Sequence, residues 1–395
     1  MDNNQYRYNI KLEYMYDKQL VIIESAQIHS LTIDYDYDNR NMPIMFLKAS
    51  IDKNVLDHMI KNSTTNTITV IVSKFIYDMY PKIEQNYIRD RFIYFLSKDM
   101  NINKDLDYGG YTKDAEDIYR TVTIGLMKLD NINNNKVMIN DVFINTTIMN
   151  MFLKCVNHMK LLIEPFKETK SIDRFIIPPT TSVTNLVKYF DDYFSLYNTP
   201  YRLFYDYDKT YLISSSGESV PDYGDDSYSI IINVNNTTKL KSKIQGMEID
   251  RNQKAYFIDV DSTDISMFQD EATDKTFNTI ITVDGNGKYK KVKLETENID
   301  QTREKAIIER VHNDNLEIAN RMKRVIEDKS ISVNVVKTDI DTSKITINKE
   351  YIIRNFDKLG YRNGKFLLAR KREVYTLDND TFILSCIMTF RKILS

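Results

Sequence analysis

Apolar and polar residues alternate along most of this chain, and only a few stretches show helical spacing. Near the N-terminus, Tyr8, Ile10, Leu12 and Tyr14 occupy every second position, the period of a strand with one buried face. Residues 88–96 fit either a strand or a helix. The predicted strands are 6–16, 19–25, 30–37, 43–50, 65–75, 119–129, 175–177, 201–205, 210–213, 229–234, 241–249, 254–260, 276–283, 289–295, 331–337, 344–347, 365–370, 373–376 and 382–392.

Helical spacing predicts four helices among these strands. Side chains that can accept a hydrogen bond from the free amides of the first turn support some of these starts. The capping or first residues are Asp52, Asn145 or Thr146, Thr181 or Ser182, and Thr302. The longest helix is expected over residues 302–328, with apolar residues on one face and charged residues on the other. The asparagine-rich segment 130–135 is predicted to be a polar turn.

The segment 175–214 has the most legible pattern of the chain. A short apolar run ends at Pro178 and Pro179, which stop it and fix an extended entry to the next element. A helix with an aromatic face follows, and then two short strands joined by a turn at residues 206–209. The helix face consists of Leu186, Phe190, Tyr193, Phe194 and Tyr197.

This pattern resembles the baseplate hub proteins of contractile-tailed bacteriophages. The matching segments are Ile177–Pro179, Thr184–Tyr197, Tyr201–Asp206 and Tyr211–Ser214, all of them structural residues. The resemblance implies an α+β, mostly β fold with two tail-tube-like β-barrels, each with a packed helix, and a small α/β region. It also implies a homotrimer, a ring of pseudo-sixfold symmetry that matches a hexameric tail tube above and a trimeric spike below.

Three regions follow from the order of the predicted elements. Residues 1–114 are expected to form the first tube-like barrel, 115–225 the α/β middle region, and 226–395 the second barrel, which includes the helix 302–328. The polar, turn-rich stretch 214–226 is the best linker candidate. An arrangement in which these domains are interleaved stays open.

Composition excludes several classes of protein. The 395 residues include 54 Lys and Arg and 56 Asp and Glu, for a net charge of −2 without a basic stripe, so no nucleic-acid specificity is expected. No apolar run approaches the roughly 18 residues of a membrane span, so no stable membrane insertion is expected. The polar N-terminus does not resemble a signal peptide. Cys155 and Cys386 are expected to be buried reduced thiols, as suits assembly in the bacterial cytoplasm.

The sequence contains no catalytic, cofactor-binding or metal-binding motif, and no residue is nominated for any of these roles. The histidines, which lack metal-ligand spacing, are expected to be structural. They are His29, His58, His158 and His312. Asp259, Asp261 and Asp264 depart from a calcium loop, because the sixth position is Asp264 instead of glycine.

Asp34, Asp36 and Asp38 alternate with two tyrosines and would share one face of a strand, which points to a solvent or lumenal face.

The predicted function is that of a non-enzymatic structural protein of the virion, a trimeric baseplate hub that joins the tail tube to the central spike. The expected partners are copies of the chain itself, the tail tube or distal tail protein, the central spike protein and other baseplate proteins. Cofactors are not expected. The alternatives are another tail protein, such as a distal tail or receptor-binding protein, and a tail-associated cell-wall hydrolase that uses two of the many carboxylates.

Overall fold

A computed structural model describes the chain in segments. They are residues 6–63, 66–76, 85–96, 118–156, 159–166, 171–194, 196–197, 201–214, 228–235, 254–261, 265–269, 279–283, 289–293, 306–310, 331–338, 342, 345–347, 349, 351–355 and 364–392. The predicted strand 241–249 lies outside these segments, as do His158, His312 and Asp264.

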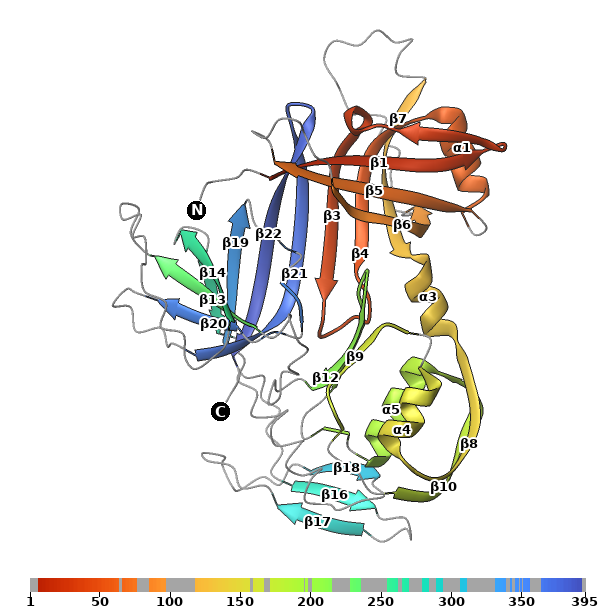
Figure 1. The fold of residues 1–395 in the computed structure, drawn as a ribbon, viewed down its shortest axis with the longest axis vertical. Coiled ribbons are helices and arrows are strands. Elements are labelled where there is room, and N and C mark those ends of the chain that lie inside the picture. The colour runs from red at the N-terminus through yellow and green to blue at the C-terminus, as the bar shows by residue number, and fades with distance from the viewer. Residues whose placement is uncertain are drawn as a thin grey trace.

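Eight antiparallel strands close into a barrel that takes strands from both ends of the chain (Figure 1). Each strand of the ring pairs with the next, and the circle closes where β22 returns to β1 at the pair Tyr8 and Phe382. Closure leaves none of these eight strands with an open edge along its paired length. In ring order the strands are β1 (Tyr6–Tyr16), β5 (Thr67–Ile76), β6 (Gln85–Leu96), β7 (Tyr119–Lys128), β4 (Ile44–Asp52), β3 (Ile28–Asp36), β21 (Gly364–Asp378) and β22 (Thr381–Lys392).

The barrel interior is a packed core and not a channel. Alternate residues of every strand point inward, including Tyr8, Ile10, Leu12 and Tyr14 of β1, and all four are buried as their spacing predicts. An eight-stranded barrel has an interior that side chains can fill.

Helix α1 (Lys53–Lys61) packs against this barrel, and its cap is the predicted one. The Asp52 carboxylate accepts hydrogen bonds from the backbone N–H groups of Asn54 and Val55 at 2.8 and 3.3 Å. Its inner face buries Leu56 and Met59. Strand β2 (Gln19–Ile23) pairs with β1 at one side of the barrel.

The hairpin β21–β22 is longer than the barrel needs and continues into a second set of strands. One half of β21 pairs with β3, and the other half pairs with β20 (Tyr351–Asn355). A bulge between Leu368 and Arg370 lies where the two halves meet. The strands beyond it are β13 (Tyr228–Asn235) and β14 (Lys254–Asp261) next to β20, and β19 (Ile331–Thr338) and β15 (Ile265–Gln269) next to β22.

The middle region builds a separate core against the barrel's lower end (Figure 1). A two-stranded ribbon is covered on one face by two helices, and a three-stranded sheet lies between the helices and the barrel. The ribbon is β8 (Met138–Thr147) with β10 (Ser171–Ser182), the helices are α4 (Ile148–Cys155) and α5 (Val183–Phe194), and the sheet is β11 (Tyr201–Tyr205), β12 (Thr210–Ser214) and β9 (Leu161–Ile163).

The predicted helix 302–328 is wrong where the structure describes it. Ala306–Arg310 is strand β18, which pairs in parallel with β16 (Thr279–Val283); β17 (Tyr289–Lys293) completes this small sheet. The β-branched pair Ile307 and Ile308 suits a strand, and so short an apolar run does not by itself distinguish the two structures. The rest of 302–328 lies outside the described residues.

The predicted turn 130–135 is also wrong, because Leu129–Lys136 forms helix α3. A tertiary contact accounts for it: the buried side-chain amide of Asn131 donates to the Tyr205 carbonyl at 2.9 Å. The mostly β fold with few helices and one closed barrel agree with the prediction, although this barrel takes β7, β21 and β22 from outside residues 1–114. A second barrel stays a prediction.

Candidate functional site: the junction hairpin

The hairpin of β11 and β12, residues 201–214, lies between the two cores of the molecule and is here called the junction hairpin. Cross-strand partners share a face. Phe204 and its partner Tyr211 belong to the barrel core, whereas Leu203 and its partner Leu212 belong to the core of the middle region. A strand pair buried on both faces has no solvent side, so the hairpin fixes the middle region against the barrel.

Arg202 joins the hairpin to the barrel wall. Its guanidinium donates to the Leu368 carbonyl at 2.9 Å and pairs with the Asp38 carboxylate at 2.7 Å. The Arg202 side chain is only 2% exposed, so these contacts replace its hydration. The Leu368 carbonyl lies at the bulge of β21, and the neighbouring Ala369 carbonyl accepts from the Tyr37 N–H at 3.1 Å. The bulge therefore presents acceptors to the hairpin and to the loop after β3.

The turn of the hairpin reaches into the barrel. The Tyr207 ring meets the rings of Tyr35 and Phe92 edge-on, each with centroids 6.1 Å apart. The Lys128 ammonium donates to the Tyr207 carbonyl and pairs with Asp90 at 3.0 Å. These contacts place the turn at the end of the barrel interior.

On the opposite side, the middle region holds the hairpin through Glu164. This buried carboxylate accepts from the Ser214 N–H at 2.7 Å, and the Tyr197 hydroxyl donates to the Glu164 carbonyl at 2.7 Å. Ser214 and Tyr197 are the last residues of two segments that carry the hub resemblance. These two motif residues therefore hold the hairpin in the middle region.

A buried ionic network lies inside the barrel next to the hairpin turn. The Lys371 ammonium is 3.2 Å from the Glu373 carboxylate, and the Tyr375 hydroxyl donates to the same carboxylate at 3.1 Å. Burial lowers the pKa of Lys371, but Glu373 and Asp206 outweigh this effect, so its pKa is raised overall. Burial raises the pKa of the Asp206 carboxyl to about 6, although Lys371 acts in the opposite direction.

The predicted alternation is confirmed for Asp34, Tyr35 and Asp36, but β3 ends at Asp36, so Asp38 lies in the turn that follows and not on the strand face. Tyr35 points into the barrel core, while Asp34 lies on the outer face. Asp34 is nevertheless buried, because the guanidinium groups of Arg40, Arg370 and Arg372 cover it at 2.9, 2.8 and 3.4 Å. Burial opposes ionisation of the Asp34 carboxyl, but the arginines outweigh it, and its pKa is lowered.

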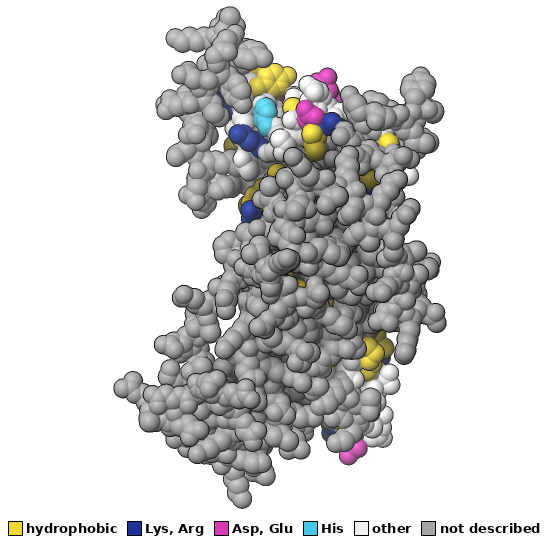
Figure 2. All heavy atoms as spheres, turned by 90° about the vertical axis from the view of Figure 1, so that its left-hand side faces the viewer, with side chains coloured by type: hydrophobic (Ala, Val, Ile, Leu, Met, Phe, Trp, Pro, Cys, Tyr) yellow, Lys and Arg dark blue, Asp and Glu magenta, His cyan; other side chains and the backbone are white. Residues whose placement is uncertain are grey.

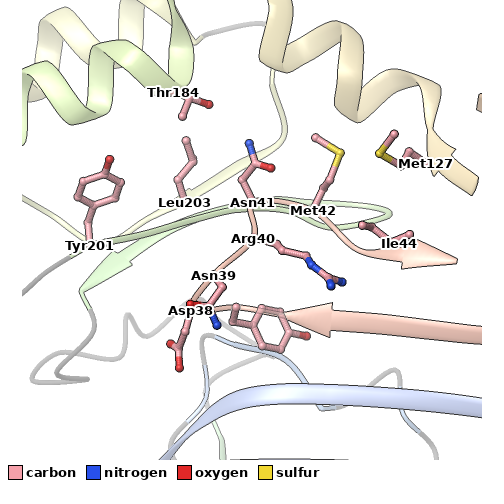
Figure 3. A pocket seen from close by; sticks show the side chains of 11 residues that line it. Asp38, Asn39, Arg40, Asn41, Met42, Ile44, Met127, Thr184, Tyr201 and Leu203 are labelled. Atoms are coloured by element: carbon pink, nitrogen blue, oxygen red, sulfur yellow. The ribbon is translucent and has the colours of Figure 1, made fainter. Parts of the chain in front are cut away.

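A pocket of about 540 Å³ opens beside the junction hairpin (Figure 3). Met42, Ile44 and Met127 line one side, and Tyr201 and Leu203 of β11 line the other. Polar groups of the β3–β4 loop and Thr184 of α5 complete it. The pocket is a gap between the barrel and the middle region, and its charged groups are already engaged in the contacts described above.

The histidines and cysteines considered as candidate site residues occupy structural positions wherever the structure describes them. The His29 ring lies 2.8 Å from the Ser50 hydroxyl, and the His58 ring lies 2.8 Å from the Tyr14 hydroxyl. Cys386 is buried, Cys155 is half-buried, and both are free thiols. In the described part of the chain, His, Cys, Asp and Glu side chains do not gather into a metal-binding group. Among the described helices, none has the length and apolar character of a membrane span.

Comparison with known proteins shows the family of this chain. Residues 4–393 match the family model described as Bacteriophage PBS1 gene 109 protein. The chain belongs to this family. A search of the curated proteins found no match.

Two solved tail proteins share the fold over nearly the whole chain. One is the tail protein from Neisseria meningitidis MC58, with 10% identity and a TM-score of 0.53, covering 98% of this chain and 97% of the other. The second is the 43 kDa tail protein of prophage MuSo2 from Shewanella oneidensis, with 10% identity, a TM-score of 0.51 and the same coverage. At this identity the likeness is one of fold. The family match and the shared fold agree with the resemblance to phage tail proteins that the sequence indicated.

Proposed function

We propose that this chain is a structural protein of a phage tail, a baseplate hub that joins the tail tube to the central spike. The observation that carries the proposal is the fold shared over the full length with two tail proteins, in a chain whose family is a phage family. The proposed place of action is the tail baseplate of the virion.

The junction hairpin supports a role in transmitting load rather than in chemistry. Its two buried faces and the ion pair of Arg202 with Asp38 tie the barrel to the middle region without an intervening linker. The charged groups buried in the barrel bind one another and adjacent backbone. A protein organised in this way serves as a rigid connector.

The proposed assembly is a homotrimer in which each chain contributes two tube-like domains to a ring. In the described residues, the long sheet ends at β14 and β15, whose outer backbone groups are available to another strand. Pairing across such edges would satisfy those groups, and an obligate ring of this kind would bury on the order of 2,000 Å² or more per contact. The second barrel belongs to this proposal. Because the closed barrel takes β7, β21 and β22 from outside residues 1–114, the division into residues 1–114, 115–225 and 226–395 is proposed in its interleaved form.

Cryo-electron microscopy of the purified chain tests the proposal directly. Threefold rings with pseudo-sixfold inner symmetry are expected, with the tail tube or distal tail protein on one side and the spike protein on the other in purified tails. A stable monomer would contradict the hub. Clear lysis of peptidoglycan by the purified chain, lost when one Asp or Glu is replaced, would favour the hydrolase, and binding of the isolated chain to host cells would favour the receptor-binding protein.

A further inference from the structure

The ribbon β8–β10 has a bare apolar face. Its inner face packs on α4 and α5, and by strand alternation the paired positions Val142 with Ile176 and Ile144 with Arg174 share the outer face. The large apolar side chains of this face are the exposed ones: Met138 (62%), Val142 (49%), Ile144 (67%) and Ile176 (51%). By contrast, the described side chains at the barrel end of the face in Figure 2 mix hydrophobic groups with charged ones. The outer face of the ribbon is thus mostly apolar, with Asn140 between Met138 and Val142.

The edges of the ribbon are less open than its face. Pro178 and Pro179 of β10 have no N–H to donate to an added strand. On β8, the Asp141 carboxylate accepts from the Val142 N–H at 2.8 Å and is itself paired with Lys154 at 3.2 Å. An incoming strand would have to displace these bonds. A partner therefore fits best by packing face to face on the ribbon.

Charge and area on this face argue for a partner other than a second copy. Arg174 is the charged residue at its paired positions, and none of them holds a carboxylate. Two copies packed face to face would bring a second Arg174 and no acid. The four apolar side chains expose on the order of 400 Å², the size of a functional patch but about half of the ~800 Å² per partner in a stable interface. The contact suits a partner already held nearby by other contacts.

We propose that the outer face of the β8–β10 ribbon is the docking surface for a different tail protein, which presents an apolar face flanked by a carboxylate that meets Arg174. The inference rests on the proposed function, because the partner is sought in the tail. In Figure 1 the ribbon lies at the opposite end of the molecule from α1 and the barrel. Partners can therefore reach it without displacing neighbours bound to the barrel.

The test uses the full chain in assembled tails, with a photo-activated cross-linking residue in place of Ile144 as the probe. Irradiation of purified tails is expected to join the chain to a different tail protein, and mass spectrometry of the product is expected to place the cross-link in an apolar segment with a neighbouring Asp or Glu. A cross-link to a second copy of this chain, or no cross-link, would overturn the inference. A chain absent from purified tails would instead contradict the proposed function.

A matched pair of variants tests the charge. Arg174→Glu is expected to reduce the amount of cross-linked product about tenfold, whereas Lys188→Glu, the same charge change on an exposed position of α5, is expected to leave it unchanged. Both variants are at the surface, so equal melting temperatures and equal oligomeric states of the purified chains are expected. Equal amounts of cross-linked product from both variants would contradict the proposal that the partner presents a carboxylate to Arg174.

Discussion

The barrel and the β8–β10 ribbon differ in how their strands are paired and how their faces are covered. The eight barrel strands close on themselves, so their inner faces fill one core and their backbone groups pair around the ring. The ribbon has two strands, one face on helices and one face bare. An isolated two-stranded sheet is marginal in water. The barrel can therefore be stable through its own contacts, whereas the ribbon depends on α4 and α5 beneath it.

The junction hairpin decides whether these two regions behave as one. Because it contributes to both cores, a change in it is expected to affect both, while a change in one core leaves the other intact. The following variants rank the contacts that connect or separate the regions.

The largest effect is expected from a charge placed in either core. Phe204→Asp on the barrel side of the hairpin and Phe190→Asp in the middle region each put a carboxylate at a position with 0% exposure. The cost should exceed about 4 kcal/mol, from the lost packing and the buried charge. Soluble yield should be lost in both. The control is Phe46→Asp on the outer barrel face, which is expected to stay soluble; cooperative melts for all three variants would refute the core assignment.

The buried ion pair of the barrel should show strong coupling. Glu373→Gln leaves the Lys371 ammonium without its carboxylate at a fully buried site and is expected to cost about 3 kcal/mol. The double variant Lys371→Met/Glu373→Leu removes both charges and should come close to the native stability. Urea unfolding of Lys371→Met, Glu373→Leu and the double variant closes the cycle. Additive losses would mean that the pair does not act as a unit.

A smaller effect on stability, but a clear effect on cooperativity, is expected from Arg202→Met. The change leaves the Asp38 carboxylate and the Leu368 carbonyl without this donor, at a cost of about 2 kcal/mol. Calorimetry should then resolve two transitions where the native chain has one, because the barrel and middle region separate. Arg372→Met, at a half-exposed arginine 3.4 Å from Asp34, serves as the control and should keep one transition.

Local patterns predicted most strands of the barrel, because each has one face in a core; the exceptions are β6, which fitted a strand or a helix, and the middle of β21. Strand β1 occupies the predicted residues 6–16, and the cap of α1 is the predicted Asp52. The hairpin 201–214 was equally clear, since its turn interrupts two compact apolar runs. These elements are specified by residues that are close together in the sequence.

What sequence reasoning missed depends on contacts between distant segments. Helix α3 is held by Asn131 bonded to Tyr205, and a run rich in asparagine gives no local sign of it. The predicted break between residues 370 and 373 is wrong, because β21 is continuous there. Lys371 and Glu373 are charged, yet each finds its partner inside the barrel. The one sequence signal for a continuous strand was that Lys371 and Glu373 occupy alternate positions of a β-rich segment.

The mildest change, Asp206→Asn, tests the junction through pH. The folded-state pKa of Asp206 is raised to about 6, so the folded chain binds its proton more tightly than the unfolded chain does. Its contribution to stability is therefore full below about pH 4 and is lost as pH rises through about 6. Because Asp206 is partly exposed at its surface, Asp206→Asn should stabilise the protein by only about 1 kcal/mol at pH 7.5. The gain should vanish below pH 4, where the native carboxyl is neutral too.

Asp208→Asn makes the same charge change at an exposed position of the same turn and should have little effect at either pH. Equal melting temperatures of Asp206→Asn and the native chain at pH 7.5 would show that water reaches this carboxylate, and that the hairpin turn is not sealed into the end of the barrel.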